Sequence, residues 1–238
     1  MVKLISNKNP HSLTTLFFTE MWERFSYYGM RALLVLYLVN SLNYSNAEAL
    51  HIYAIYTGLV YLTPIIGGYL ADRYLGTQKT IFIGGITMML GHFLMAFPNL
   101  LYLAMGLLII GNGYFKPNIS TLLGKLYKTN DTRRDSGFSI FYIGINLGAF
   151  LAPLIVGFVG ETINWHYGFA IAGIGMFAGL LQFYFGQNKI IEEDTSKKTI
   201  KLNSSDWGSI LFFSLINIPI ILLVFKINSY INIYIYEI

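Results

Sequence analysis

Apolar residues fall into long runs that are separated by short polar segments. Six runs cover residues 13–39, 51–71, 80–96, 100–122, 137–160 and 167–186. Each is close to the length of about 20 residues that a helix needs to cross a bilayer. A seventh run, 207–225, follows a charged segment that is expected to be a solvated connection. The pattern predicts an all-α membrane protein in three parts: a six-helix bundle at 1–186, a connecting segment at 187–205, and a seventh helix with a tail at 206–238.

The positions of Lys and Arg predict the orientation of the chain. The loops near residues 43, 98 and 164 contain neither residue. Twelve basic residues lie outside the runs on the opposite side: Lys3, Lys8, Arg73, Lys79, Lys125, Lys128, Arg133, Arg134, Lys189, Lys197, Lys198 and Lys201. Basic loops stay on the cytoplasmic side of a membrane. We therefore expect a multi-pass protein of the cytoplasmic membrane, with a cytoplasmic N-terminus and a cytoplasmic connecting segment.

Composition narrows the class of protein. Hydrophobic residues make up 55% of the chain and charged residues 12%, whereas soluble domains carry about 25% charged residues. The net charge of +4 does not indicate a nucleic-acid partner. With no cysteine and four scattered histidines, the sequence offers no metal site and no thiol chemistry. It shows no nucleophile motif either, so an enzyme is the least favoured class. The polar first ten residues predict that there is no cleavable signal peptide.

Five charged residues lie inside the predicted spans, where each would cost about 3 kcal/mol or more in contact with lipid. Four belong to the first span, and at 100° per residue they share one face of about 100° with a tyrosine. This face, the charged stripe, consists of Glu20, Glu23, Arg24, Tyr27 and Arg31. It is either a static ion-pair network or a proton or substrate site. Buried ion pairs contribute little to stability, which favours the functional interpretation.

The fifth intramembrane charge, Lys116, lies in a helix that two glycines and Pro117 are expected to loosen. Tyr142 and Asn146 share a face of the fifth span, and Asn146 could also serve simply as a hydrogen-bonding contact between helices. Lys116 and Asn146 are expected to face the charged stripe. The set of three bases and two acids suits a ligand with a carboxylate, and its glutamates could accept a proton when their cationic partners move away.

Four segments carry a resemblance to a known family. Residues 20–31 (EMWERFSYYGMR) resemble the ExxERFxYYG signature of the proton-dependent oligopeptide transporter (POT/PTR) family of the major facilitator superfamily. Residues 67–79 (GGYLADRYLGTQK) resemble the loop between helices two and three of that superfamily. Residues 113–118 (GYFKPN) and 141–148 (FYIGINLG) resemble two further motifs. The resemblance runs from Glu20 to about Gly186 in the family's order.

The resemblance implies proton-coupled symport of di- and tripeptides, with the proton gradient in place of any cofactor. It assigns proton coupling to Glu20, Glu23 and Arg24. It assigns gating to Asp72 and Arg73, for which helix capping is the alternative. The residues that it implies for peptide binding are Tyr27, Tyr28, Arg31, Tyr61, Lys116, Tyr142 and Asn146.

The chain departs from the family in its extent. Family members have twelve core helices in two bundles, whereas this sequence has six core spans and a seventh helix that resembles an inserted one. The fold is therefore expected to be the N-terminal bundle, built from two inverted three-helix repeats. Because alternating access needs both bundles, the chain is not expected to transport alone. A same-fold transporter of nitrate or another small anion, a half-transporter that pairs with another chain, and a non-transporting remnant are the alternatives.

Overall fold

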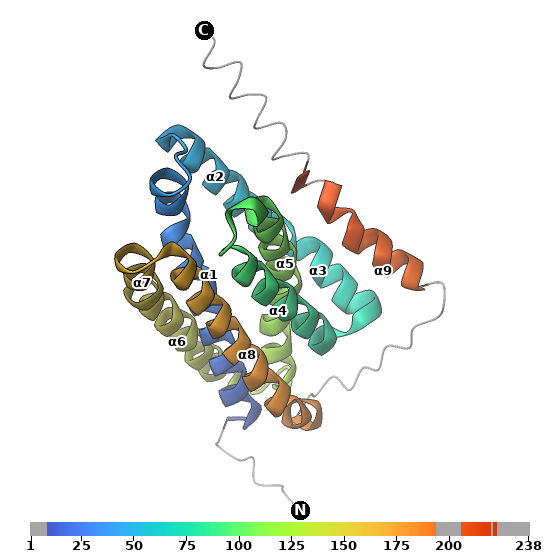
Figure 1. The fold of residues 1–238 in the computed structure, drawn as a ribbon. Helices are drawn as coiled ribbons and strands as arrows, with labels where there is room; N and C mark the ends of the chain where they lie inside the picture. Colours follow the sequence, from blue (N-terminus) through green and yellow to red (C-terminus); the bar gives the residue numbers. More distant parts are fainter. Residues whose placement is uncertain (1–8, 194–205, 220, 223–238) are drawn as a thin grey trace, which may run out of the picture.

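The computed structural model describes residues 9–193, 206–219, 221 and 222. These residues form helices and short connections, without a strand among them (Figure 1). The order is α1 (Ser12–Asn40), α2 (Asn46–Leu62), α3 (Pro64–Leu70), a π-helical turn (Ala71–Leu75), α4 (Thr77–Leu94), a 3-10 turn (Pro98–Leu100), α5 (Leu101–Lys125), α6 (Arg134–Ala152), a second π-helical turn (Pro153–Gly157), α7 (Phe158–Thr162), α8 (Trp165–Glu193) and α9 (Asp206–Leu215). The prediction of an all-α protein is confirmed.

Two of the expected spans are interrupted helices. The run at 51–71 contains α2, α3 and part of the first π-helical turn, and α2 begins earlier than expected because Ser45 and Glu48 form a capping box. Pro64, which has no N–H to donate, begins α3. The run at 137–160 is likewise divided, at Pro153. Helix α8 continues beyond 186 to Glu193, and α9 occupies the start of the seventh run. The three-part division stays a prediction, since 194–205 and 223–238 lie outside the described residues.

When helices are judged by length and apolar composition alone, fewer of them qualify as membrane spans than the sequence predicts. Four described segments are long and apolar enough to cross a membrane: Asn46–Leu75, Pro98–Lys125, Arg134–Thr162 and Trp165–Glu193. The expected spans at 13–39 and 80–96 are helices but fall short of that standard. Helix α1 carries four charged residues, and α4 begins with the polar pair Gln78 and Lys79. The charges of α1 are accommodated by neighbouring helices, as described below, rather than by lipid.

The two groups of three spans interlock. Helix α1 of the first group packs against α6 and α8 of the second, whereas α5 of the second group packs against α3 and α4 of the first (Figure 1). Helices α4 and α8 join the two groups. Each group therefore places its first helix between the second and third spans of the other. This reciprocal arrangement agrees with the expected pair of three-helix repeats.

Glycines enclose α1 from two sides. On α6, an added Cβ at Gly144 would lie 2.9 Å from the carbonyl oxygen of Phe17, and one at Gly148 would lie 2.2 Å from that of Met21. On α8, Gly175 and Gly179 contact the same helix in a similar way. Small residues let helix backbones approach closely. The close approach buries these two faces of α1 against α6 and α8.

The close approach of α3 to α5 depends on a freed carbonyl group. Pro117 has no N–H to donate to the carbonyl of Gly113, four residues earlier. That carbonyl oxygen points at Gly67, where an added Cβ would lie 2.0 Å away. Asn118 Nδ2 holds the two helices together by donating to Gly67 O at 3.2 Å and to Tyr114 O at 2.7 Å.

The last residue of α8 caps the first turn of α1. The backbone N–H groups of His11 and Ser12 donate to Glu193 Oε1 at 3.1 Å and Oε2 at 2.9 Å. A carboxylate at this position satisfies unpaired N–H groups and complements the helix dipole. Glu193 lies in the segment 187–205 that the sequence predicts to be a solvated connection, and the structure shows that it contacts α1 instead of only solvent.

Candidate functional site

The charged stripe contains a buried cluster on α1. Glu20 and Glu23 are fully buried and Arg24 is 6% exposed. The Arg24 guanidinium donates to both oxygens of Glu23, with a Nη2–Oε1 distance of 2.6 Å. Its Nε also lies 3.3 Å from Glu20 Oε1. One guanidinium therefore faces two carboxylates. A second cation is needed to neutralise the remaining negative charge.

Helix α5 supplies that cation and an amide. Lys116 Nζ donates to Glu20 Oε1, and Asn112 Nδ2 donates to Glu23 Oε1 at 3.3 Å. The Lys116 side chain is 31% exposed, whereas Glu20 is completely enclosed. Lys116 is thus the member of the cluster that a solute can reach. The other oxygen of Glu20, Oε2, is buried without a hydrogen-bond partner in the described part of the chain.

Tyrosine rings surround the two arginines of the stripe. The Tyr27 ring lies between them, with its centroid 4.9 Å from Arg24 Cζ and 5.4 Å from Arg31 Cζ. The Tyr28 ring lies 5.9 Å and 5.8 Å from the same two atoms. Cation–π contacts of this kind contribute about 0.5–2 kcal/mol each. Tyr27 and Tyr28 therefore position both guanidinium groups without neutralising them.

Arg31 lies at the C-terminal end of the charged stripe and is held there by α2. Its Nε donates to the Tyr53 hydroxyl at 3.0 Å, and Nη2 contacts the same oxygen. The guanidinium also lies 5.2 Å from the Tyr53 ring centroid. Arg31 remains half-buried and pairs with a neutral group, so its positive charge is available to an anion.

Asn112 and Tyr53 are two members of the site that the sequence analysis did not select. Asn112 lies four residues before Lys116, and this spacing, which puts both on one helical face, was a usable signal. Tyr53 belongs to none of the quoted motifs. Its contact with Arg31 depends on how α2 packs against α1, so no pattern along the chain could have identified it.

Three of the predicted binding residues are exposed, unlike the buried members of the cluster. Tyr61 is 73% exposed and Tyr142 is 58% exposed. Asn146 is also exposed, and its Nδ2 donates to Tyr142 O of its own helix at 2.9 Å. The expectation that Asn146 faces the charged stripe is therefore wrong. Helix α6 contacts α1 through Gly144 and Gly148, and a residue midway between these two points to the other side of the helix.

The predicted gating pair lies in the first π-helical turn. Asp72 and Arg73 are both exposed there, at the end of the span that α2 and α3 begin. Their roles, like those of the binding residues, stay predictions. In the described part of the chain, no three His, Asp or Glu side chains come close enough together to hold a metal ion.

Known proteins are similar to this chain in sequence and in fold. A sequence profile of the POT family (PTR2) matches residues 78–217. The uncharacterized transporter YclF of Bacillus subtilis is 53% identical over 189 residues, which are 76% of this chain and 38% of that protein. The di-/tripeptide transporter of Lactococcus lactis subsp. lactis is 50% identical over 188 residues, with coverage of 75% and 38%. A crystal structure of peptide transporter POT in complex with sulfate superposes with a TM-score of 0.80 at 44% identity, over 92% of this chain and 46% of that one.

The helical bundle and its apolar segments define a multi-pass membrane transporter fold. The chain belongs to the POT family. It spans less than half the length of the relatives compared above. The resemblance that the motifs indicated is thus confirmed, and the relatives are transporters rather than enzymes.

Proposed function

We propose that this chain supplies one half of a proton-coupled symporter of di- and tripeptides in the cell membrane. The main observation in support is the ion pair between the buried Glu20 and the partly exposed Lys116. The similarity to a di-/tripeptide transporter supports the peptide substrate. The distribution of Lys and Arg supports a cytoplasmic N-terminus. The positive end of the bundle, which includes the 125–134 loop, is then its cytoplasmic end.

The geometry suggests how peptide binding and protonation are linked. A peptide carboxylate that reaches Lys116 competes with Glu20 for the same ammonium group. Arg24 cannot fully compensate, because its stronger contacts are with Glu23. A buried carboxylate that loses a cationic partner is stabilised by taking up a proton. Arg31 would provide a second positive group for the bound carboxylate, held in place by Tyr53.

The exposed residues of the predicted site are consistent with a substrate path whose other wall is formed by further protein. Tyr61, Tyr142 and Asn146 have surfaces that this half does not cover. Alternating access requires two bundles that move around a central site. We propose that segments equivalent to the unmatched part of the relatives cover these surfaces. A proton gradient would provide the energy, with no other cofactor.

A chimaera tests this proposal. Residues 9–193 would replace the matching segment of the Lactococcus lactis transporter, and uptake of labelled Ala-Ala would be measured with and without a pH gradient. We expect accumulation that Glu20→Gln uncouples from the gradient, while exchange of Ala-Ala across the membrane continues. Lys116→Gln should abolish uptake. Lys79→Gln, which changes an exposed lysine, is the control. Undiminished pH-driven accumulation in both site variants would contradict the assigned roles.

A small inorganic anion is the second candidate substrate. The positive balance of the site favours it, and a related transporter has been crystallised with sulfate. In the same chimaera, nitrate and sulfate would be tested as competitors of Ala-Ala uptake. Strong inhibition by nitrate with accumulation of labelled nitrate would favour this alternative. Inhibition by peptides with free carboxylates, and not by their amides, would favour the peptide.

A further inference from the structure

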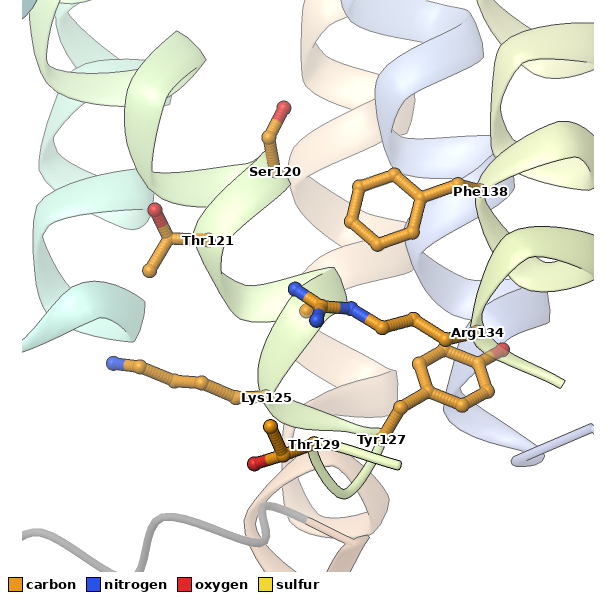
Figure 2. Close-up of a pocket in the computed structure, with 8 residues that line it drawn as sticks. Ser120, Thr121, Lys125, Tyr127, Thr129, Arg134 and Phe138 are labelled. Carbon is orange, nitrogen blue, oxygen red and sulfur yellow. The ribbon is translucent and has the colours of Figure 1, made fainter. Parts of the chain in front are cut away.

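A cationic pocket opens between α5 and α6 at the positive end of the bundle (Figure 2). Its volume is about 440 Å³. Its lining contains two basic residues and no acidic ones: Ser120, Thr121, Gly124, Lys125, Tyr127, Thr129, Arg134 and Phe138. None of these residues belongs to the site described above, and the sequence analysis used Lys125 and Arg134 only as indicators of orientation.

The pocket continues the faces that carry the proposed peptide site. Ser120 and Gly124 follow Lys116 at intervals of four residues on α5. Arg134 and Phe138 precede Tyr142 at the same interval on α6. Residues at this spacing lie on one helical face. A peptide leaving Lys116 toward the positive end would therefore move along these two faces into the pocket.

Arg134 is the cation directed into the pocket. Figure 2 shows its side chain reaching from α6 toward the part of α5 that carries Thr121 and Lys125. The guanidinium lies 5.8 Å from the Phe138 ring centroid. A Cβ at Gly124 would be only 3.5 Å from Arg134 Nη2, so the glycine leaves space beside the charge. The neighbouring cations have other contacts: Lys125 donates to Thr77 Oγ1, and Arg133 binds Asp131.

We propose that this pocket is a second station, which binds the carboxylate of a peptide after it leaves Lys116. A guanidinium binds a carboxylate through two parallel hydrogen bonds, and the hydroxyls of Ser120 and Thr129 line the same space. Lys116 and Gly124 are separated by roughly 12 Å along α5, at 1.5 Å per residue. An extended dipeptide spans at most about 7 Å. A peptide has one terminal carboxylate, which cannot bind Lys116 and Arg134 at once, so the two stations act in succession.

This inference rests on the proposed function, and the absence of cysteine from the chain allows both to be tested separately. Thr121→Cys would report on the pocket and Tyr142→Cys on the peptide site, each in a cysteine-free form of the chimaera described above, purified in nanodiscs of neutral lipid. The measurement is the rate of modification by an anionic and by a cationic methanethiosulfonate reagent. At position 121 we expect preference for the anionic reagent, and protection by Ala-Ala but not by its C-terminal amide.

Variants of the pocket give the decisive comparison. Arg134→Gln should lower the anionic preference at least about threefold, as expected for one charge at roughly 6 Å in a watery site, and Arg134→Lys should retain it. Gly124→Leu, which keeps the charge and fills the space, should remove the protection by Ala-Ala. This second variant decides the question if Arg134→Gln does not fold.

Three results would overturn the proposal. Protection by Ala-Ala at position 142 without protection at 121 would eliminate the second station and leave the proposed function intact. Absence of protection at both positions would count against both. Protection at 121 that requires added phosphatidylglycerol rather than Ala-Ala would identify the occupant as a lipid headgroup.

Discussion

Lys116 of α5 donates to Glu20 of α1, across 96 residues of sequence, on the same oxygen that Arg24 approaches to 3.3 Å. Glu20 is therefore held by one enclosed cation and one that is partly open to solutes. This asymmetry gives the cluster a removable partner, which a symmetric network of enclosed ions would lack.

Removing the ammonium group of Lys116 should destabilise the bundle, because it leaves the buried carboxylate of Glu20 with one cationic partner fewer. We expect Lys116→Met to cost about 2 kcal/mol, less than the roughly 3–5 kcal/mol typical of a fully buried pair, because part of the lysine is exposed. The combined Glu20→Gln and Lys116→Met variant should lose less than the sum of the single changes. Thermal unfolding in detergent measures both, with Lys128→Met as the exposed control. Strict additivity would show that the two residues are not coupled.

A methyl group at Gly67 should disrupt the packing of α3 on α5. Its Cβ would lie 2.0 Å from the backbone oxygen of Gly113, which cannot rotate away. We expect Gly67→Ala to cost about 3 kcal/mol or slightly more. At Gly58, by contrast, an added Cβ meets nothing within 4 Å, so Gly58→Ala is the matched control. The two melting temperatures in detergent decide the matter, and equal values would refute the close approach.

Neutralising Glu193 should loosen the first turn of α1. Glu193→Gln keeps the shape of the side chain but weakens the interaction with the His11 and Ser12 N–H groups, at a cost of about 1 kcal/mol. Hydrogen exchange should become faster at these amides. Glu192→Gln, on the exposed neighbour, should leave their exchange unchanged. Equal protection in both variants would mean that the cap is not formed in the membrane.

Asp131, in the loop between α5 and α6, should stay ionised to low pH. Hydrogen bonds from Arg133, including one at 2.6 Å, bring the pKa of Asp131 down from 3.8 to about 2. Because the folded pKa is the lower one, the stabilising contribution of this carboxylate is complete above about pH 4 and is lost as the pH falls through 2. Carboxyl NMR measures the midpoint. Arg133→Gln should return it toward 3.8, and an unmoved midpoint would contradict the assignment.

The periodicity of the first span determined much of the site. Glu20, Glu23 and Arg24 lie together on one buried face of α1, as their spacing indicated, and Tyr27 lies between the two arginines. This could be inferred because the 3.6-residue repeat fixes which side chains of one helix share a face. The high energy of charge in lipid then indicated that the face must be covered by protein.

The contacts between helices had to come from the tertiary structure. Tyr53 and Glu193 were not predicted, and Asn146 was expected on the wrong side of α6. These outcomes depend on which face of each helix packs against its neighbour, and the faces of α3 and α6 are set by close approaches at Gly67 and Gly148. A sequence pattern shows that a glycine permits such an approach, but not which helix makes it.

The sequence by itself determined an all-helical membrane bundle, its family and the charged face of α1, because apolar run length and helical phase are local properties of the chain. Only the tertiary structure decided that Glu20 is paired with Lys116, that Arg31 is held by Tyr53, and that a cationic pocket lies beyond them. Those relationships join residues from different helices, and their distances are fixed by the packing of the whole bundle.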